Sequence, residues 1–318
     1  MEVARLLAPQ CQRELYRYSR SGRSRRDIRC IAVPWPGEFC VLHERKAENS
    51  VYVKGWGIMV VPNRPTRPGV HLAAPHPQYD LLTPQQAAAV FEGVGAKSLL
   101  ISGRIRTALL NATTCITGSG TVYYATDPAH NDKEPFVISQ QRDMEMATST
   151  RWMSVGLLRI HPDAWQRCQY LLDRRCLSFN WTGSVYVTST SHRVDIVSIN
   201  LTLYPGRSAS SLAWYTDSVD RPIKRIQKNI QQANPSWNVS LPSDSNCGLT
   251  ATLNVFGRFI NGVEESLVCE QGATAQLAAG AFVHIEQAKG SRQPDAYGSW
   301  IRALNASFPV ERYMTVSY

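Results

Sequence analysis

Residues 70–102 read VHLAAPHPQYDLLTPQQAAAVFEGVGAKSLLIS, and this stretch decides the fold. Its first five and last five residues are short apolar runs with the length of buried strands. Between them, Thr83 is a suitable N-cap for a helix, Pro84 occupies the first helical position, and Gly95 offers a left-handed stop. A strand, a helix and a strand within about 35 residues form a βαβ unit. The sequence therefore predicts a parallel sheet.

The rest of the chain continues this alternation of strands and helices. Strands are expected at residues 51–62 (on both sides of a glycine-containing turn), 155–160, 183–203 (as a hairpin or an insertion) and 281–285. Helices are expected at residues 134–146, at 220–234 with Asp220 as N-cap, and at 297–304. These patterns predict an α/β fold of three layers, α/β/α, around a mostly parallel or mixed central sheet.

Length and composition favour one large domain. The chain has 318 residues, of which 43% are hydrophobic, and this is ample for a packed core. Residues 1–30 are rich in arginine and predict a disordered basic tail, so the domain is expected to span residues 31–318, with a possible insertion at 165–203. The tail carries much of the net charge of +9, so nucleic acid is not an expected partner. No apolar run is long enough to predict a membrane span.

Two features favour the secretory route. The eight cysteines are scattered, without the close pairing typical of structural zinc sites, and this pattern suits disulfides. N-x-[S/T] sequons occur at Asn111, Asn180, Asn200, Asn238 and Asn305. Residues 1–30 hold no apolar signal segment, so either the true start lies upstream or the protein is intracellular with free thiols. The cysteines and sequons favour the first alternative, a secreted glycoprotein.

Polar side chains follow several of the predicted strands. His76 and Asp80 come after residues 70–74, Arg104 after 98–102, His161 after 155–160, and Glu286 after 281–285. Ligands of open parallel α/β sheets bind outside the carboxyl ends of the strands. Imidazoles, carboxylates and a guanidinium at one such edge have the composition of a hydrolytic zinc site.

Two further segments each leave two interpretations open. Asp127 and His130 lie three residues apart, either in a capped turn or in an active-site loop where His130 contacts an anion. Arg258, in residues 254–265, either clamps a substrate carboxylate or belongs to an ordinary turn with two glycines.

The motif APHPQYD at residues 74–80, His161 after a later strand and the ending HIE at residues 284–286 resemble the zinc-dependent carboxypeptidase fold. Among its variants, the bacteriophage-type poly-γ-glutamate hydrolases are the most similar. Residues 205–268 also resemble a group of secreted fungal proteins of undetermined function. The metallohydrolase resemblance implies zinc held by a histidine, a nearby carboxylate and a later histidine, with a glutamate on a late strand as base.

These observations together predict a secreted zinc-dependent hydrolase of amide bonds, a peptidase or a γ-glutamyl amidohydrolase. Zinc would be held by His76, Asp80 and His161, and Glu286 would act as general base. Arg104, Arg258 and His130 would hold a peptide-like or poly-acidic substrate. Two alternatives remain: a non-catalytic secreted binding protein on a decayed hydrolase scaffold, and a metal-independent hydrolase that uses Asp127 and His130.

Overall fold

The computed structural model describes most of the predicted domain. Its described residues are 28–33, 39–45, 52–62, 66–145, 153–159, 198–202, 208–244, 251–278 and 280–309. The predicted tail up to residue 27, His161, and all of the possible insertion except residues 198–202 lie outside this set. The first strand begins at Ile28, three residues before the expected start of ordered sequence.

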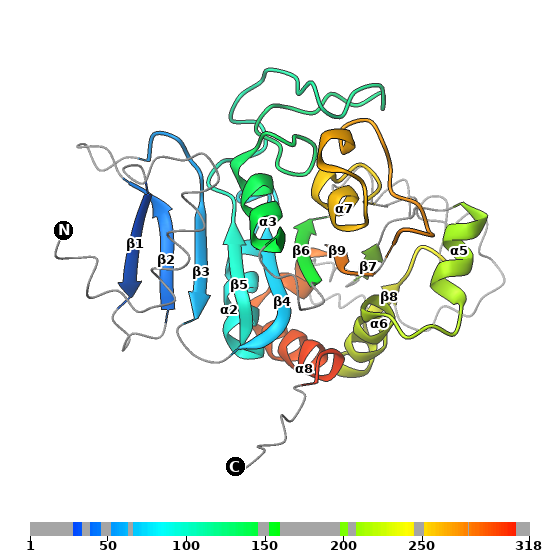
Figure 1. The fold of residues 1–318 in the computed structure, drawn as a ribbon. Helices are drawn as coiled ribbons and strands as arrows, with labels where there is room; N and C mark the ends of the chain where they lie inside the picture. Colours follow the sequence, from blue (N-terminus) through cyan, green and yellow to red (C-terminus); the bar gives the residue numbers. More distant parts are fainter. Residues whose placement is uncertain are drawn as a thin grey trace, which may run out of the picture.

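In the described residues, nine strands form one mixed sheet in the order β1-β2-β3-β5-β4-β6-β9-β7-β8 (Figure 1). The strands are β1 (Ile28–Val33), β2 (Phe39–Glu44), β3 (Ile58–Pro62), β4 (Arg67–Ala74), β5 (Ala96–Ile101), β6 (Met153–Arg159), β7 (Ser198–Thr202), β8 (Asn238–Ser240) and β9 (Phe282–Gln287). The four central strands β5, β4, β6 and β9 are mutually parallel. The neighbours β3 and β7 join this centre in antiparallel pairing. The α/β class is therefore confirmed, with a mixed sheet.

Helices lie against both faces of the central strands. The helices are α2 (Thr83–Val94), α3 (Pro135–Glu145), α5 (Ala209–Thr216), α6 (Pro222–Ala233), α7 (Val255–Ile260) and α8 (Tyr297–Ser307). Short 3-10 turns cover Glu265–Leu267, Lys289–Arg292 and Pro294–Ala296. The largest core cluster packs α2, α6 and α8 against β4, β5 and β9. A second cluster joins α3 and α7 to Phe282 on the opposite face of β9 (Figure 1).

The decisive βαβ prediction is confirmed. Strands β4 and β5 are parallel neighbours joined by α2, and Gly95 ends α2 with φ 64°. One detail is wrong: the N-cap is Leu82, with φ 72°, and Thr83 is already the first helical residue. The Thr83 hydroxyl instead donates to the carbonyl oxygen of Asp80 at 2.7 Å. This hydrogen bond ties the start of the helix to the loop that follows β4.

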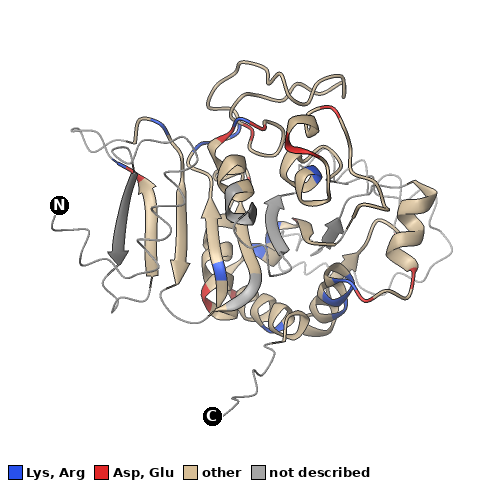
Figure 2. Ribbon diagram, in the orientation of Figure 1, with Lys and Arg blue, Asp and Glu red and all other residues tan. Residues whose placement is uncertain are grey.

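Other elements differ in their boundaries. Residues 52–57 form no strand, because two glycines in left-handed conformations, Gly55 and Gly57, interrupt the extended run before β3. Helix α6 is capped by Arg221, because proline at the next position sets the helix start, while Asp220 pairs with Arg225. The predicted isoleucine stripe of α6 is buried, and the helix also carries a run of basic residues (Figure 2).

Gly57 is fixed by close backbone packing, and this leads to a stability prediction. A Cβ at Gly57 (φ 84°) would overlap the carbonyl oxygen of Ile101 and lie 2.7 Å from the Gly103 nitrogen. Gly57→Ala should lower the free energy of unfolding by roughly 3–5 kcal/mol, because backbone atoms must move. Gly118 is the matched control: its φ is 76° but no atom lies within 4 Å of its Cβ position. Gly118→Ala should cost only about 1–2 kcal/mol. If urea unfolding shows the same loss of stability for both variants, the close backbone contact is not what destabilises Gly57→Ala.

Candidate functional site

The loop that follows β4 begins at the carboxyl edge of the parallel strands. The Ser102 amide after β5 donates to the carbonyl oxygen of Ala74 at 3.1 Å, so the ends of β4 and β5 are held together. The loop then folds back, and the Asp80 amide donates to the His76 carbonyl oxygen at 2.9 Å. This turn places the His76 and Asp80 side chains on the same side of the loop.

The His76 imidazole lies between two carboxylates. Its Nδ1 is 3.2 Å from Oδ2 of Asp80, and its Nε2 is 3.1 Å from Oδ1 of Asp127. All three side chains are buried, with His76 only 3% exposed. Both ring nitrogens therefore have an anionic neighbour, and the ring is fixed in position and orientation.

Asp127 also supports the loop from which it comes. Its Oδ1 accepts a hydrogen bond from the Ala129 amide at 3.0 Å, which is the predicted capped turn. Its Oδ2 is 3.1 Å from Nδ1 of His130, but this contact lacks hydrogen-bond geometry. The His130 ring stacks on Tyr123 with centroids 3.6 Å apart. Asp127 thus joins the two predicted segments around His76 and His130.

The charges of this cluster shift its proton affinities. Burial alone would lower the pKa of His76, but the charge of Asp127, then the contacts with both carboxylates, outweigh burial and raise it to about 9. Burial alone would raise the pKa of Asp127, but the His76 charge and the imidazole contacts hold it well below its usual range. Burial lowers the pKa of His130. In the metal-free protein at neutral pH, His76 is therefore a cation and His130 is neutral.

The prediction that Glu286 follows its strand is wrong: Glu286 lies within β9, on the same face of the sheet as Phe282, because side chains alternate along a strand. Val283 and Ile285 point to the opposite core. Oε1 of Glu286 is 3.0 Å from Nε2 of His284, and Oε2 has no hydrogen-bond partner within the described residues.

The register relates Glu286 to the loop after β4. Ala73 of β4 pairs with Gly156 of β6, and Gly156 pairs with His284 of β9. In the chain direction of these parallel strands, His76 follows Ala73 and Glu286 follows His284. Only β6 lies between β4 and β9. Both residues therefore lie toward the carboxyl edge, and strands two places apart are separated by about 10 Å.

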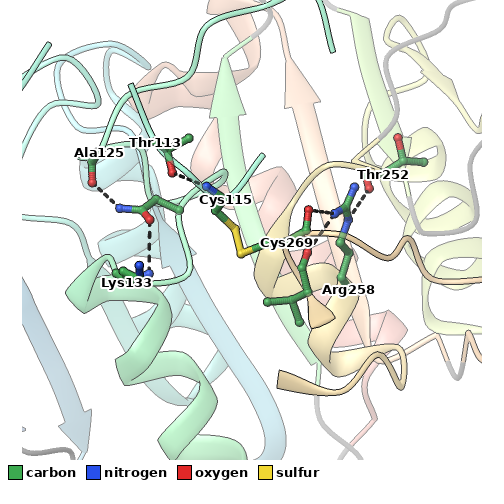
Figure 3. The surroundings of a disulfide bond; sticks show 9 residues. Thr113, Cys115, Ala125, Lys133, Thr252, Arg258 and Cys269 are labelled. Atoms are coloured by element: carbon green, nitrogen blue, oxygen red, sulfur yellow. Dashed lines mark hydrogen bonds between the residues drawn. A yellow bond between two sulfur atoms is a disulfide. The ribbon is translucent and has the colours of Figure 1, made fainter. Parts of the chain in front are cut away.

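The two predicted substrate-binding arginines already have partners in the chain. Nη2 of Arg104 contacts both carboxylate oxygens of Glu134, at 2.9 and 3.0 Å, and Glu134 is buried. Arg258 is buried in α7, an element not predicted as a helix, and donates to carbonyl oxygens of three residues: Thr252, Val268 and Cys269 (Figure 3). Within the described part of the chain, Nε of Arg104 has no hydrogen-bond partner, whereas Arg258 stabilises the backbone around Cys269.

Arg258 gives a stability prediction of its own. Arg258→Met should lower the free energy of unfolding by about 2–4 kcal/mol, because three carbonyl groups lose a charged donor inside the protein. The matched control is Arg302→Met in α8, since Arg302 is exposed and donates only to the Ser299 hydroxyl. Chemical denaturation of both variants checks this, and similar losses for the two would contradict the structural role.

The predicted disulfide character is confirmed at one described pair. Cys115 and Cys269 form a disulfide between residues 154 positions apart, and Cys40 is also disulfide-bonded. Asp132 lies beside the first pair: a carboxylate oxygen and the two sulfurs all lie within 4.8 Å of one another. Among the described residues this is the one group of three potential metal ligands so close together. The scattered cysteine spacing gave no signal for it.

In comparisons with known proteins, no family model, curated protein or solved structure matches the chain. Within the described residues, no helix is both long and apolar enough to span a membrane.

Proposed function

We propose that this chain is a secreted zinc-dependent hydrolase of amide bonds, built as a three-layer α/β/α domain. The observation that supports it is the buried His76 imidazole, which lies between Asp80 and Asp127 at the carboxyl edge of parallel strands. That edge is where α/β sheets of this kind bind their ligands.

The residues present fit a zinc ion. Two ligands of a tetrahedral zinc, each about 2.0–2.1 Å from the metal, lie roughly 3.3 Å apart. Nδ1 of His76 and Oδ2 of Asp80 are 3.2 Å apart, a spacing that suits two ligands of one ion once Nδ1 has lost its proton. Asp127 then accepts the Nε2 hydrogen of the ligand ring from the other side, the usual arrangement of a zinc-bound histidine. His161, outside the described residues, stays the proposed third ligand.

A bound zinc ion would supply Lewis-acid chemistry that lowers the pKa of water toward neutrality. Glu286 would be the general base, accepting a proton from the attacking water and passing it to the leaving amine. His284 contacts one oxygen of Glu286 and leaves the other oxygen for the proton. Asp127 keeps the His76 ring oriented, and Nδ1 of His130 lies 3.1 Å from its other oxygen.

The contacts of the two arginines refine the proposed substrate site. The Arg258 guanidinium donates its hydrogen bonds to backbone carbonyl oxygens. We therefore assign the recognition of an acidic substrate group to Arg104. The Arg104 side chain is half-buried, and its Nε is a buried atom that has no hydrogen-bond partner among the described residues. A peptide-like or γ-glutamyl substrate with an acidic group fits this cation. His130 would contribute indirectly, through Asp127.

Metal analysis and hydrolysis assays test the proposal. The oxidised wild-type protein, reconstituted with zinc, should hold about one ion per chain and cleave a peptide or γ-glutamyl amide. Asp80→Asn should weaken zinc binding, because a neutral amide replaces an anionic ligand. Glu286→Gln should keep the zinc and lose about 10²–10⁴-fold in rate, the usual contribution of a general base. Absence of zinc from the wild type, or equal zinc content in Asp80→Asn, would refute the metal site.

The alternative of a non-catalytic binding protein is favoured by one observation. His76 and Asp80 are only 3% and 4% exposed, so a substrate must open the site to reach them. A wild-type protein that binds zinc but hydrolyses no amide would support this alternative.

A further inference from the structure

The disulfide joins two segments that are distant in the sequence but meet above β9. Cys115 lies in the long connection after β5, and Cys269 lies in the segment after α7 (Figure 3). Asp132 lies next to Lys133, near the start of α3, with a carboxylate oxygen within 4.8 Å of both sulfurs. Two sulfurs and one carboxylate therefore converge from three separate positions in the chain.

Contacts other than the disulfide hold each cysteine in place. The Cys115 amide donates to the Thr113 hydroxyl at 3.1 Å. The carbonyl oxygen of Cys269 accepts from Arg258 Nη1 at 3.2 Å, and so does that of Val268 at 2.9 Å. The two sulfurs are thus positioned by the backbone and would stay close if the bond between them were opened.

The third position is fixed in the same way. Asn131, the residue before Asp132, donates from its side-chain amide to the carbonyl oxygen of Ala125 at 2.5 Å. Its side-chain oxygen accepts from the Lys133 amide at 3.4 Å. The turn that carries Asp132 is therefore anchored through Asn131, and the Asp132 carboxylate lies within 4.8 Å of both sulfurs.

We infer that Cys115, Cys269 and Asp132 form a second metal site, which opens when the disulfide is reduced. A dithiol reductant gives two electrons and two protons to the sulfur–sulfur bond, so that two cysteine thiols form and the dithiol becomes a disulfide. Each thiol then releases its proton to solvent as its thiolate binds the ion. Two thiolates and one carboxylate suit Zn²⁺ or Co²⁺ in a tetrahedral site whose fourth ligand is water, and they disfavour Mg²⁺ and Ca²⁺.

Such an ion would replace the disulfide as the link between the two segments. The connection that carries Cys115 and Asp132 also carries Asp127, which contacts His76, and His130, which lies beside Asp127. A metal link would therefore keep this connection attached to the segment after α7 under reducing conditions. The inference does not depend on the proposed hydrolase activity.

Cobalt titration of the full chain tests the site. The protein is reduced with a dithiol under nitrogen, freed of the reductant, and titrated with Co²⁺ beside the oxidised protein. The reduced wild type should bind one more ion per chain than the oxidised form, with a thiolate-to-cobalt absorption band in the near ultraviolet. Asp132→Asn should lower the affinity for this ion by at least about 10–100-fold, since even the loss of a partner outside the ligand shell lowers metal affinity by that much.

Matched variants separate this site from the other cysteines and from the proposed zinc site. The Cys115→Ser/Cys269→Ser variant should lose the extra ion and the band. Glu270→Gln, which removes an exposed charge next to Cys269, should retain both. His76→Ala should also retain them, which distinguishes this site from the proposed catalytic one. No extra ion in the reduced wild type, an extra ion in the double-serine variant, or unchanged affinity in Asp132→Asn would each overturn the inference. Asp132→Asn keeps the disulfide, so the test holds even if the double-serine variant does not fold.

Discussion

His76→Ala should lower the free energy of unfolding of the metal-free protein by about 3–5 kcal/mol at neutral pH. The substitution removes the cation between Asp80 and Asp127, and both carboxylates are buried beside it. Breaking a buried ion pair leaves an uncompensated charge, and here two carboxylates lose the same partner. The expected loss is therefore larger than that for an ordinary surface histidine. Urea unfolding in the presence of a chelator measures the effect without a contribution from bound metal.

A double-mutant cycle isolates the ion pair. Asp127→Asn removes one of the two carboxylates, so His76→Ala should cost less in that background, with a coupling energy of about 1–3 kcal/mol. His43→Ala is the matched control, because His43 is a buried histidine whose Nδ1 contacts only a backbone oxygen, that of Glu44. It should show no coupling to Asp127. Additive losses for His76 and Asp127 would mean that their contact contributes nothing to stability.

The sequence was most informative where structure depends on short-range patterns. The βαβ unit around α2 could be predicted because Pro84 and Gly95 mark both helix ends and apolar runs flank them. Helix α7 could not be predicted in this way, because its six residues include Gly257, which weakens any helical signal. A local signal did exist: the Asn254 side chain accepts from the Gly257 amide as an N-cap. The cap at Leu82 was missed because a non-glycine residue rarely takes a positive φ.

The candidate site was predictable only in part for a related reason. His76 and Asp80 are four residues apart, so their proximity follows from one local turn. Asp127 approaches His76 from a connection 51 residues later, where no periodic pattern constrains the backbone. The partners of Arg104 and Arg258 are likewise set by tertiary contacts, a buried glutamate and backbone carbonyls. Residue type and position after a strand therefore identified His76 and Asp80 as candidates, while their pairing with Asp127 depended on packing.

Above neutral pH, the metal-free protein should lose stability through His76. The pKa of His76 is about 9 in the folded protein, above the ordinary value of 6.5. The folded state therefore binds the proton more tightly, and the resulting stability is fully present below pH 6.5 and lost as the pH rises through 9. The loss should amount to about 3 kcal/mol, since each tenfold difference in proton affinity between the folded and unfolded states corresponds to about 1.4 kcal/mol.

Three other buried groups reduce the stability of the protein at acidic pH instead. The pKa of Asp127 is lowered in the folded protein, so its contribution is present above its ordinary pKa and is lost as the pH falls. Burial also lowers the pKa of His130, and that of His71, so both disfavour the folded state as acid protonates them. Stability should therefore be greatest near pH 6.5 to 7, between these losses.

The variant His76→Gln distinguishes the stability that His76 loses at alkaline pH from changes caused by the other titrating groups. It removes the titrating group but keeps a polar side chain between the two carboxylates. Unfolding free energies measured in urea from pH 6 to pH 10, with chelator present, should decline for the wild type by about 3 kcal/mol more than for the variant. The decline should fall between pH 6.5 and 9, because these are the pKa values of His76 in the unfolded and the folded protein. Parallel curves for the two proteins would show that His76 carries no extra proton in the fold, and the cationic bridge between Asp80 and Asp127 would then be wrong.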